Sequence, residues 1–375
     1  MKELHFIDLA AQQARLRDRI DARIAGVLDH GAYIMGPEVA ELEAKLAAFC
    51  GAAHCISCAN GTDALQLGLM ALGVRTGDAV FVPSFTFAAT AEVVPCMGAT
   101  PVFVDIDPAT YTMQADSLRR AVAHAKTLGL RPAAVIAVDL FGLPADYAAL
   151  QAVADTEGLV MMADSAQGWG GLIDGQMTGT FGKLTTTSFF PAKPLGCYGD
   201  GGAIFTDDAA LAAVLDSLRV HGKGSDKYDN TRIGMNSRLD TLQAAILLEK
   251  LAIYEDEIAA RNAVATRYSA ALHNYFVTPQ VPQGYRSIWA QYTLRTKDST
   301  MRAGVMDALK SAGIPATIYY PRPLHRQTAF AEFPADPAGL EQSAAAAKTV
   351  FSLPMHPYLT LTDQDRIIGV LQQAC

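Results

Sequence analysis

Short apolar runs alternate with stretches of helical spacing between residues 79 and 208. Each run is rich in Val, Ile, Phe, Met or Thr. Runs of this kind predict strands that are buried on both faces of a mainly parallel sheet, with helices packed over it. The runs occupy residues 79–87, 101–107, 133–142, 159–167, 185–190 and 201–208.

Helical patterns precede and follow the predicted sheet. One helix is expected over residues 12–31 with Gly31 as its C-cap, and a second begins at Pro37, because proline is favoured in a first turn. Residues 239–274 form one long helical run rich in Ala and Leu. Beyond it the pattern predicts a strand at 291–296, a helix at 301–313, a strand-like segment at 315–320 and a final helix.

This organisation predicts an α/β protein with two parts. Residues 1–245 would form a large, mainly parallel sheet domain, and residues 246–375 a linking helix with a small C-terminal α/β domain. A chain of 375 residues, half of them hydrophobic, is long enough for both cores. Because ligands collect at the carboxyl ends of parallel strands, residues that directly follow those ends are candidates for a binding site.

Charge and cysteine content exclude several classes of function. The net charge of −8 argues against a general nucleic-acid binder, which would be basic. The N-terminal residues contain no apolar signal segment, and no stretch reaches transmembrane length without charges. We therefore expect a cytoplasmic protein with no nucleic-acid or membrane partner. Cys55 and Cys58 form a C-x-x-C pattern, but no second pair follows at zinc spacing, so we expect buried thiols on a strand and no metal site.

Lys193 has the most informative chemical context. An acid, Asp164, and a short hydroxyl, Ser188, precede it, and a Gly61–Thr62 turn of the phosphate-binding type lies further upstream. Pyridoxal phosphate needs these groups: a lysine to bind its aldehyde, an acid for its pyridine nitrogen, and a turn with a hydroxyl for its phosphate. The sequence therefore predicts a pyridoxal-phosphate enzyme.

Each of these residues also has an ordinary structural explanation. Lysines are usually solvated, Asp164 is suited to cap a helix, and a Gly61–Thr62 helix start is commonly plain capping. Phe87 follows a predicted strand end, where it either joins the core or stacks on the pyridine ring. The order of the residues along the chain favours the functional interpretation.

The chain resembles the DegT-type nucleotide-sugar aminotransferases, which have the aspartate-aminotransferase (type I) fold. The resemblance spans nearly the whole chain and is carried by YIMGPEVAELE, CISCANGTDALQLGLMALG, VPSFTFAATAEVV, DSAQ, SFFPAKPLGCYGDGGAIFT and NSRLDTLQAAILLEKL. It implies that Lys193 binds the cofactor covalently, that Asp164 pairs with the ring nitrogen, and that Gln167 lies against the ring and its phenolic oxygen. The implied phosphate ligands are Gly61, Thr62 and Ser188.

The resemblance also implies a homodimer, a donor and a substrate. Asn236 would reach the phosphate from the partner subunit, Arg238 and Tyr33 would line the sugar site, and L-glutamate would be the donor, leaving as 2-oxoglutarate. The likeness is greatest to enzymes that aminate C3 of UDP-2-acetamido-2-deoxy-3-oxo-glucuronate for bacterial O-antigen and lipopolysaccharide. Tyr319, however, stands where those enzymes tend to have histidine. An uncharged 3-oxo UDP-N-acetylglucosamine fits as well, and Arg286 is either a ligand of the sugar carboxylate or a solvated loop residue.

Two other functions are less well supported. Related sugar dehydratases have histidine in place of the lysine, so Lys193 argues against that chemistry. A non-catalytic regulator would not need the complete catalytic set, and no DNA-binding segment is appended.

Overall fold

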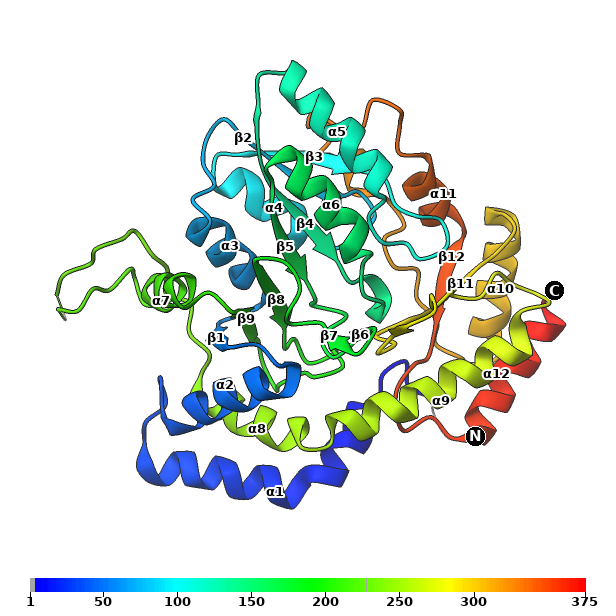
Figure 1. The fold of residues 1–375 in the computed structure, drawn as a ribbon. Coiled ribbons are helices and arrows are strands. Elements are labelled where there is room, and N and C mark those ends of the chain that lie inside the picture. Colours follow the sequence, from blue (N-terminus) through cyan, green and yellow to red (C-terminus); the bar gives the residue numbers. More distant parts are fainter. Residues whose placement is uncertain (1–3, 227) are drawn as a thin grey trace.

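A seven-stranded sheet forms the centre of the larger part of the molecule (Figure 1). The computed structural model describes residues 4–226 and 228–375. The strand order is β1-β9-β8-β5-β4-β2-β3, and only β9 runs antiparallel to its neighbours. The strands are β1 (His54–Cys58), β2 (Asp78–Pro83), β3 (Thr100–Val104), β4 (Arg131–Val138), β5 (Val160–Asp164), β8 (Leu184–Ser188) and β9 (Gly202–Thr206).

The apolar runs predicted this sheet correctly. Each of the six runs overlaps one strand, and the strand ends before the last residues of the run. Cys55 and Cys58 lie buried on β1, which confirms that the C-x-x-C pattern belongs to a strand. The prediction of a mainly parallel α/β sheet is therefore confirmed.

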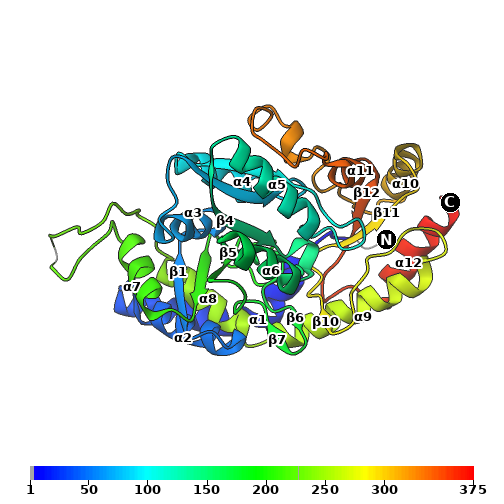
Figure 2. The ribbon, with the colours of Figure 1, turned by 45° about the horizontal axis from the view of Figure 1, so that its top comes forward.

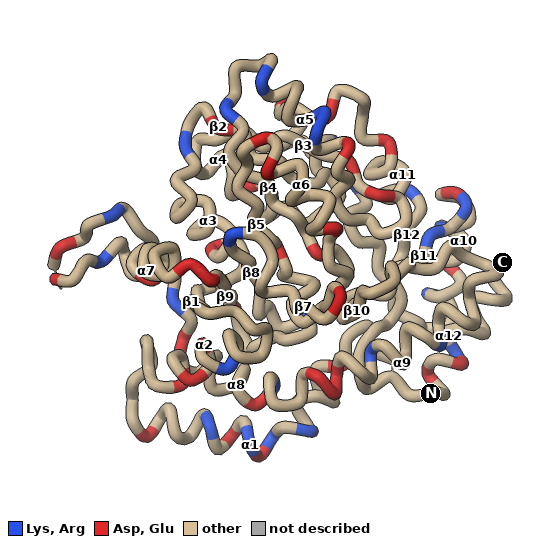
Figure 3. The backbone as a smooth tube through the Cα atoms, in the orientation of Figure 1, with Lys and Arg blue, Asp and Glu red and all other residues tan. Residues whose placement is uncertain are grey.

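Helices cover both faces of the sheet because strand residues alternate between the faces. Val80 and Val82 of β2 pack with α3 (Gly61–Ala71), α4 (Ala89–Cys96) and α7 (Ala209–Leu218). Ala79 and Phe81 of the same strand pack with α5 (Ala115–Thr127) and α6 (Tyr147–Glu157) on the opposite face. Charged residues of both signs are distributed over the helices and loops around the sheet (Figure 3).

The two predicted N-terminal helices are confirmed. α1 (Leu9–His30) ends at Gly31, which is left-handed with φ 69°, and α2 (Pro37–Cys50) begins at Pro37. Both pack against α8 (Thr241–Leu251) along one side of the sheet domain (Figure 1). None of the helices in the described chain has the length and apolar character that spanning a bilayer requires.

The long helical run predicted over residues 239–274 is wrong as a single helix. It is α8 followed by α9 (Tyr254–Leu272), with a break at Ala252 and Ile253. The break buries Ile253 in a cluster with α1, whereas α9 continues toward α12 (Leu361–Gln373). Three acidic residues begin α9, where they interact favourably with a new helix N-terminus. The predicted domain boundary at residues 245 and 246 falls inside α8 and stays a prediction.

The C-terminal part is built on the antiparallel pair β11 (Tyr292–Arg295) and β12 (Val350–Leu353). The helices α9, α10 (Ser299–Ser311) and α12 pack around this pair, and α11 (Glu341–Thr349) leads into β12. The strand-like segment predicted at 315–320 makes only one bridge, Thr317 to Ser352. That prediction is wrong because the chain turns out of the sheet at Tyr320, which has φ 55° and packs against the large domain.

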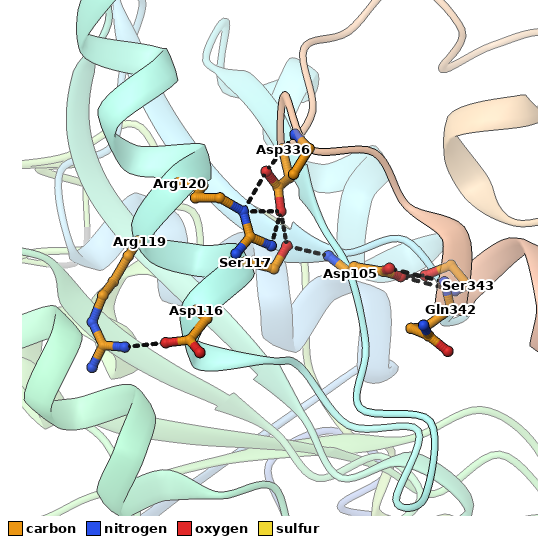
Figure 4. Close-up of polar contacts among 9 residues, drawn as sticks. Asp105, Asp116, Ser117, Arg119, Arg120, Asp336, Gln342 and Ser343 are labelled. Carbon is orange, nitrogen blue, oxygen red and sulfur yellow. Dashed lines mark hydrogen bonds and ion pairs between the residues drawn. The ribbon is translucent and has the colours of Figure 1, made fainter.

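Residues 321–340, called here the return segment, run back across the large domain (Figure 2). The segment contains the short helix η2 (Leu324–Arg326). A second short helix, η1 (Leu140–Gly142), lies in the turn after β4. The Asp336 N–H donates to the Phe103 carbonyl at 2.9 Å, so the segment adds to the free edge of β3. The Asp336 carboxylate is held by Ser117 and Arg120 of α5 (Figure 4).

Candidate active site

The parallel strands place the predicted site residues at one edge of the sheet. Asp164 is the last residue of β5 and Ser188 the last of β8, and these strands are neighbours. One cavity is lined by Gln167, Ser188 and Lys193, together with Ser165. Residues that follow β5 therefore meet residues from the end of β8 and the turn after it, where ligands of parallel sheets bind.

The phosphate turn has the groups that an anion needs. Asn60 caps α3 by accepting from the N–H of Asp63 at 2.8 Å, and the N–H groups of Gly61 and Thr62 have no protein partner within the described residues. Ser188 lies directly beside them, because a Cβ on Gly61 would stand 2.7 Å from the Ser188 Cβ. Two uncommitted amides at a helix N-terminus and an adjacent hydroxyl fit the phosphate of the cofactor.

Asp164 is a buried acid with two protein donors. Its Oδ2 accepts from the Thr90 hydroxyl at 2.9 Å, and its Oδ1 accepts from the Ala166 N–H at 3.1 Å. Burial raises the pKa of Asp164, and the Ala166 N–H, the Thr90 hydroxyl and the positive charge of Lys193 oppose that rise. A buried carboxylate so arranged fits a protonated ring nitrogen, because the cationic partner would compensate its burial.

Lys193 lies in a tight turn after β8. Its N–H donates to the Phe190 carbonyl at 2.8 Å. Burial lowers the pKa of the Lys193 ammonium, and the negative charge of Asp164 partly opposes this. A lowered pKa makes the neutral, nucleophilic amine more accessible, as covalent attachment to an aldehyde requires.

Gln167 is oriented by two hydrogen bonds. Its Oε1 accepts from the Phe141 N–H at 3.0 Å, and its Nε2 donates to the Tyr320 hydroxyl at 2.8 Å. Phe141 and Tyr320 both have positive φ and pack together in a cluster of aromatic residues. Sequence reasoning did not identify Tyr320 as part of the site, because its contact with Gln167 spans 153 positions.

A second buried acid, Asp139, supports the turn that follows Asp164. Its carboxylate accepts from the Ser165 hydroxyl at 2.5 Å, from Tyr147 at 2.7 Å and from the Ala145 N–H at 2.9 Å. Burial raises the pKa of Asp139 to about 7, although these three donors oppose the rise. Neither Asp139 nor Thr90 was predicted from the sequence. Asp139 directly follows β4, which is a local signal that could have identified it, whereas Thr90 lies in α4 and has no such signal.

The remaining predicted ligands lie on exposed segments. Phe87 precedes α4 with 57% of its surface exposed, so its ring is not part of the core. Tyr33 is 48% exposed and lies beside the loop of Arg238, because the Thr241 N–H donates to the Tyr33 carbonyl at 3.0 Å. Asn236 is exposed on the same loop as Arg238.

Two residues proposed for the sugar have partners within the chain. Tyr319 packs against Phe6 and Phe141, and burial raises its pKa. Arg286 is not on a solvated loop, as one alternative held: it lies on β10 (Tyr285–Arg286), which pairs with β6 (Leu172–Ile173), itself paired with β7 (Gln176–Met177). Its guanidinium forms an ion pair with Glu255 and donates to the Gly170 carbonyl at 2.9 Å.

Comparison with known proteins agrees with this geometry. The model of the DegT/DnrJ/EryC1/StrS aminotransferase family matches residues 14–372. The UDP-2-acetamido-2-deoxy-3-oxo-D-glucuronate aminotransferase of Pseudomonas aeruginosa is 49% identical over 95% of this chain and 96% of its own length. The UDP-N-acetyl-3-dehydro-alpha-D-glucosamine 3-aminotransferase of Acidithiobacillus ferrooxidans is 41% identical over 98% of this chain and 96% of its own.

Solved structures give the same result. The crystal structure of a DegT DnrJ EryC1 StrS aminotransferase from Brucella abortus has a TM-score of 0.97 and 54% identity, and the match covers 99% of both chains. The predicted type I fold is thereby confirmed, and solved relatives hold the cofactor that the phosphate turn, Asp164 and Lys193 fit. The chain belongs to the DegT/DnrJ/EryC1/StrS aminotransferase family and is a sugar aminotransferase with pyridoxal 5′-phosphate as its cofactor.

Proposed function

We propose that this protein transfers an amino group from L-glutamate to C3 of a UDP-linked 3-oxo-2-acetamido sugar, with 3-oxo-glucuronate as the first candidate. The observation that carries the proposal is the meeting of Asp164 and Lys193 beside the phosphate turn. The similarity to the Pseudomonas aeruginosa enzyme supports the choice of sugar. A role in O-antigen and lipopolysaccharide synthesis in the cytoplasm follows from that choice.

Each site residue then has a defined task. Bound pyridoxal phosphate supplies an aldehyde that takes up the amino group and a ring that stabilises negative charge on the adjacent carbon. Gly61, Thr62 and Ser188 bind its phosphate, while Asp164 keeps the ring nitrogen protonated. Lys193 would hold the cofactor through Nζ, and the same amine would move the proton of the donor carbon.

The homodimer and the outer ligands complete the proposal. Asn236 reaches the phosphate from the partner subunit, Phe87 stacks on the ring, and Tyr33 and Arg238 line the sugar site. Their exposure in the single chain supports these roles, because each side chain is accessible to a ligand or a second subunit. Arg286 is left out, since its guanidinium is already paired with Glu255.

The charge at C6 of the sugar separates the two candidate substrates. The second candidate, an uncharged 3-oxo UDP-N-acetylglucosamine, is supported by the Acidithiobacillus ferrooxidans relative and by Tyr319, because a tyrosine hydroxyl carries no charge at pH 7. The test is to treat the holoenzyme with L-glutamate, remove the excess, add each ketosugar and identify the aminated product by mass. Amination of neither sugar would refute the proposed substrate class.

Variants at Tyr319 show what this position contributes. Tyr319→His should raise kcat/KM for the uronate relative to the uncharged sugar, because an imidazolium can pair with the carboxylate. Tyr319→Phe is the control for the loss of the hydroxyl alone. An unchanged preference in Tyr319→His would show that this side chain does not meet C6.

A further inference from the structure

Lys250 is a buried amine that the proposed mechanism does not use. It lies in α8 with 1% of its surface exposed. Its Nζ donates to the Gly196 carbonyl at 2.6 Å and stands 4.2 Å from the centre of the Tyr198 ring. Within the described chain it forms no ion pair with a carboxylate, so the Gly196 carbonyl and the Tyr198 ring are the contacts that offset the cost of burying its charge.

Gly196, whose carbonyl accepts this hydrogen bond, closes the turn that carries Lys193. A Cβ on Gly196 would stand 2.5 Å from the Pro191 carbonyl oxygen and 2.6 Å from that of Phe190, so the two ends of the turn touch. The next residue, Cys197, donates its N–H to the Phe189 carbonyl at 2.8 Å. The position of Gly196 therefore fixes the turn from Phe190 to Gly196, with Lys193 at its middle.

Helix α8 holds the end of this turn at two points. Besides the bond from Lys250 to Gly196, the Gln243 side chain accepts from the Tyr198 N–H at 2.9 Å. α8 is itself packed between α1 and α2, so it provides a rigid support. We propose that Lys250 is a positioning residue that sets the placement of Lys193 through the Gly196 carbonyl; this rests on the proposed role of Lys193.

The charge of Lys250 makes its hydrogen bond to the Gly196 carbonyl sensitive to pH. Burial lowers the pKa of Lys250 to about 8, while Cys197 and Glu257 oppose this shift. The third acidic group that faces the amine is Tyr198, whose own pKa is raised by burial. The amine is protonated below that value and becomes neutral above it. Its hydrogen bond to Gly196 then loses the assistance of the charge, and its attraction to the Tyr198 ring is lost.

Two substitutions separate the hydrogen bond from the charge. In Lys250→Met, which removes both, kcat for the glutamate half-reaction should fall by at least about tenfold, with KM changed less than about threefold. Lys250→Gln keeps a donor for the Gly196 carbonyl and should recover most of kcat at pH 7. Lys310→Met, at an exposed position of α10, is the control and should resemble the wild type.

The direct readout is the visible circular dichroism of the bound cofactor in each holoenzyme between pH 6 and pH 10. We expect a transition near pH 8 in the wild type and in Lys310→Met, and none there in Lys250→Gln. If Lys250→Gln shows the same transition near pH 8 as the wild type, the inference is wrong. This comparison does not depend on whether Lys250→Met folds. Failure of the wild type to attach the cofactor through Lys193 would instead refute the proposed function.

Discussion

The Thr90 hydroxyl donates a 2.9 Å hydrogen bond to Oδ2 of Asp164, and both groups are buried. The bond joins the first turn of α4 to the end of β5. The second carboxylate oxygen accepts from the Ala166 N–H. Both oxygens are thereby fixed before a ligand binds, which is the preorganisation that an ion pair with a cofactor ring requires.

Removal of the Thr90 hydroxyl should weaken the charge of Asp164. Burial already raises the pKa of Asp164, and loss of a donor to the ionised form raises it further. We expect Thr90→Val to lower kcat/KM by about tenfold, as one lost hydrogen bond to a charged group predicts. Because Asp164 loses its charge as the pH falls through its pKa, the acidic limb of the pH profile should move to higher pH.

The matched control is Thr206→Val. Thr206 is buried and donates to the Lys183 carbonyl at 2.9 Å, but it lies at the opposite edge of the sheet, where β9 ends. It should leave the pH profile of kcat/KM unchanged. If both variants shift the profile alike, the bond to Asp164 has no specific effect.

The raised pKa of Asp139 should be visible in stability. Burial raises this pKa to about 7, far above the usual value of about 4 for aspartate. Between these values the folded protein binds a proton that the unfolded chain does not, so Asp139 makes stability fall as the pH rises through this window. We expect Asp139→Asn to flatten the dependence of Tm on pH between about 4 and 7. An undiminished slope in the variant would contradict a neutral Asp139.

The return segment is held by a buried carboxylate (Figure 4). Burial alone would raise the pKa of Asp336, but its hydrogen bonds to Arg120 and Ser117 outweigh burial and hold the pKa below its usual value. The stability that this carboxylate contributes is therefore present above about pH 4 and is lost as the pH falls through the lowered pKa. Asp336→Asn should reduce the free energy of unfolding by about 2 kcal/mol at pH 7.

Figure 4 also contains the control for this prediction. Asp116 and Arg119 form an ion pair on the same helix, α5, but both side chains are exposed. Asp116→Asn should change the free energy of unfolding by less than about 0.5 kcal/mol. Equal effects of the two substitutions in urea unfolding would mean that burial of Asp336 adds nothing.

Subunit mixing tests whether Asn236 acts across a dimer. Lys193→Ala and Asn236→Ala proteins should each be nearly inactive. If Asn236 serves the partner's site, dissociation and random reassociation should restore activity at about a quarter of the sites, because half of the dimers are mixed and each has one intact site. Mixtures no more active than the separate proteins would place Asn236 in the site of its own chain.

The strands of the sheet could be predicted because their signal is local. The run at 159–167 predicts β5 and also places Asp164 at its end, since a strand buried on both faces has no polar residues until it leaves the core. Ser188, the last residue of β8, was instead proposed from its spacing of five residues before Lys193. Gly31 and Pro37 marked helix ends because their backbone preferences are intrinsic.

The wrong predictions and the missed residues involve contacts between residues that are distant in sequence. Ile318 to Tyr320 have a strand-like composition, but the aromatic cluster around Phe141 draws the tyrosines away from the sheet. The pairing of Arg286 with Glu255 depends on how β10 meets α9. Thr90 and Asp139 were overlooked because a buried hydroxyl or acid gains its role from a partner that only the fold brings near.

The most direct test of the account is to identify the residue that binds the cofactor. The holoenzyme is reduced with borohydride, digested and analysed by peptide mass spectrometry, before and after treatment with L-glutamate. We predict that the pyridoxyl group is found on Lys193 in the untreated enzyme and is lost from it when glutamate is added first. A label on another lysine, or one on Lys193 that glutamate does not remove, would contradict the assignment of Lys193 as the catalytic amine.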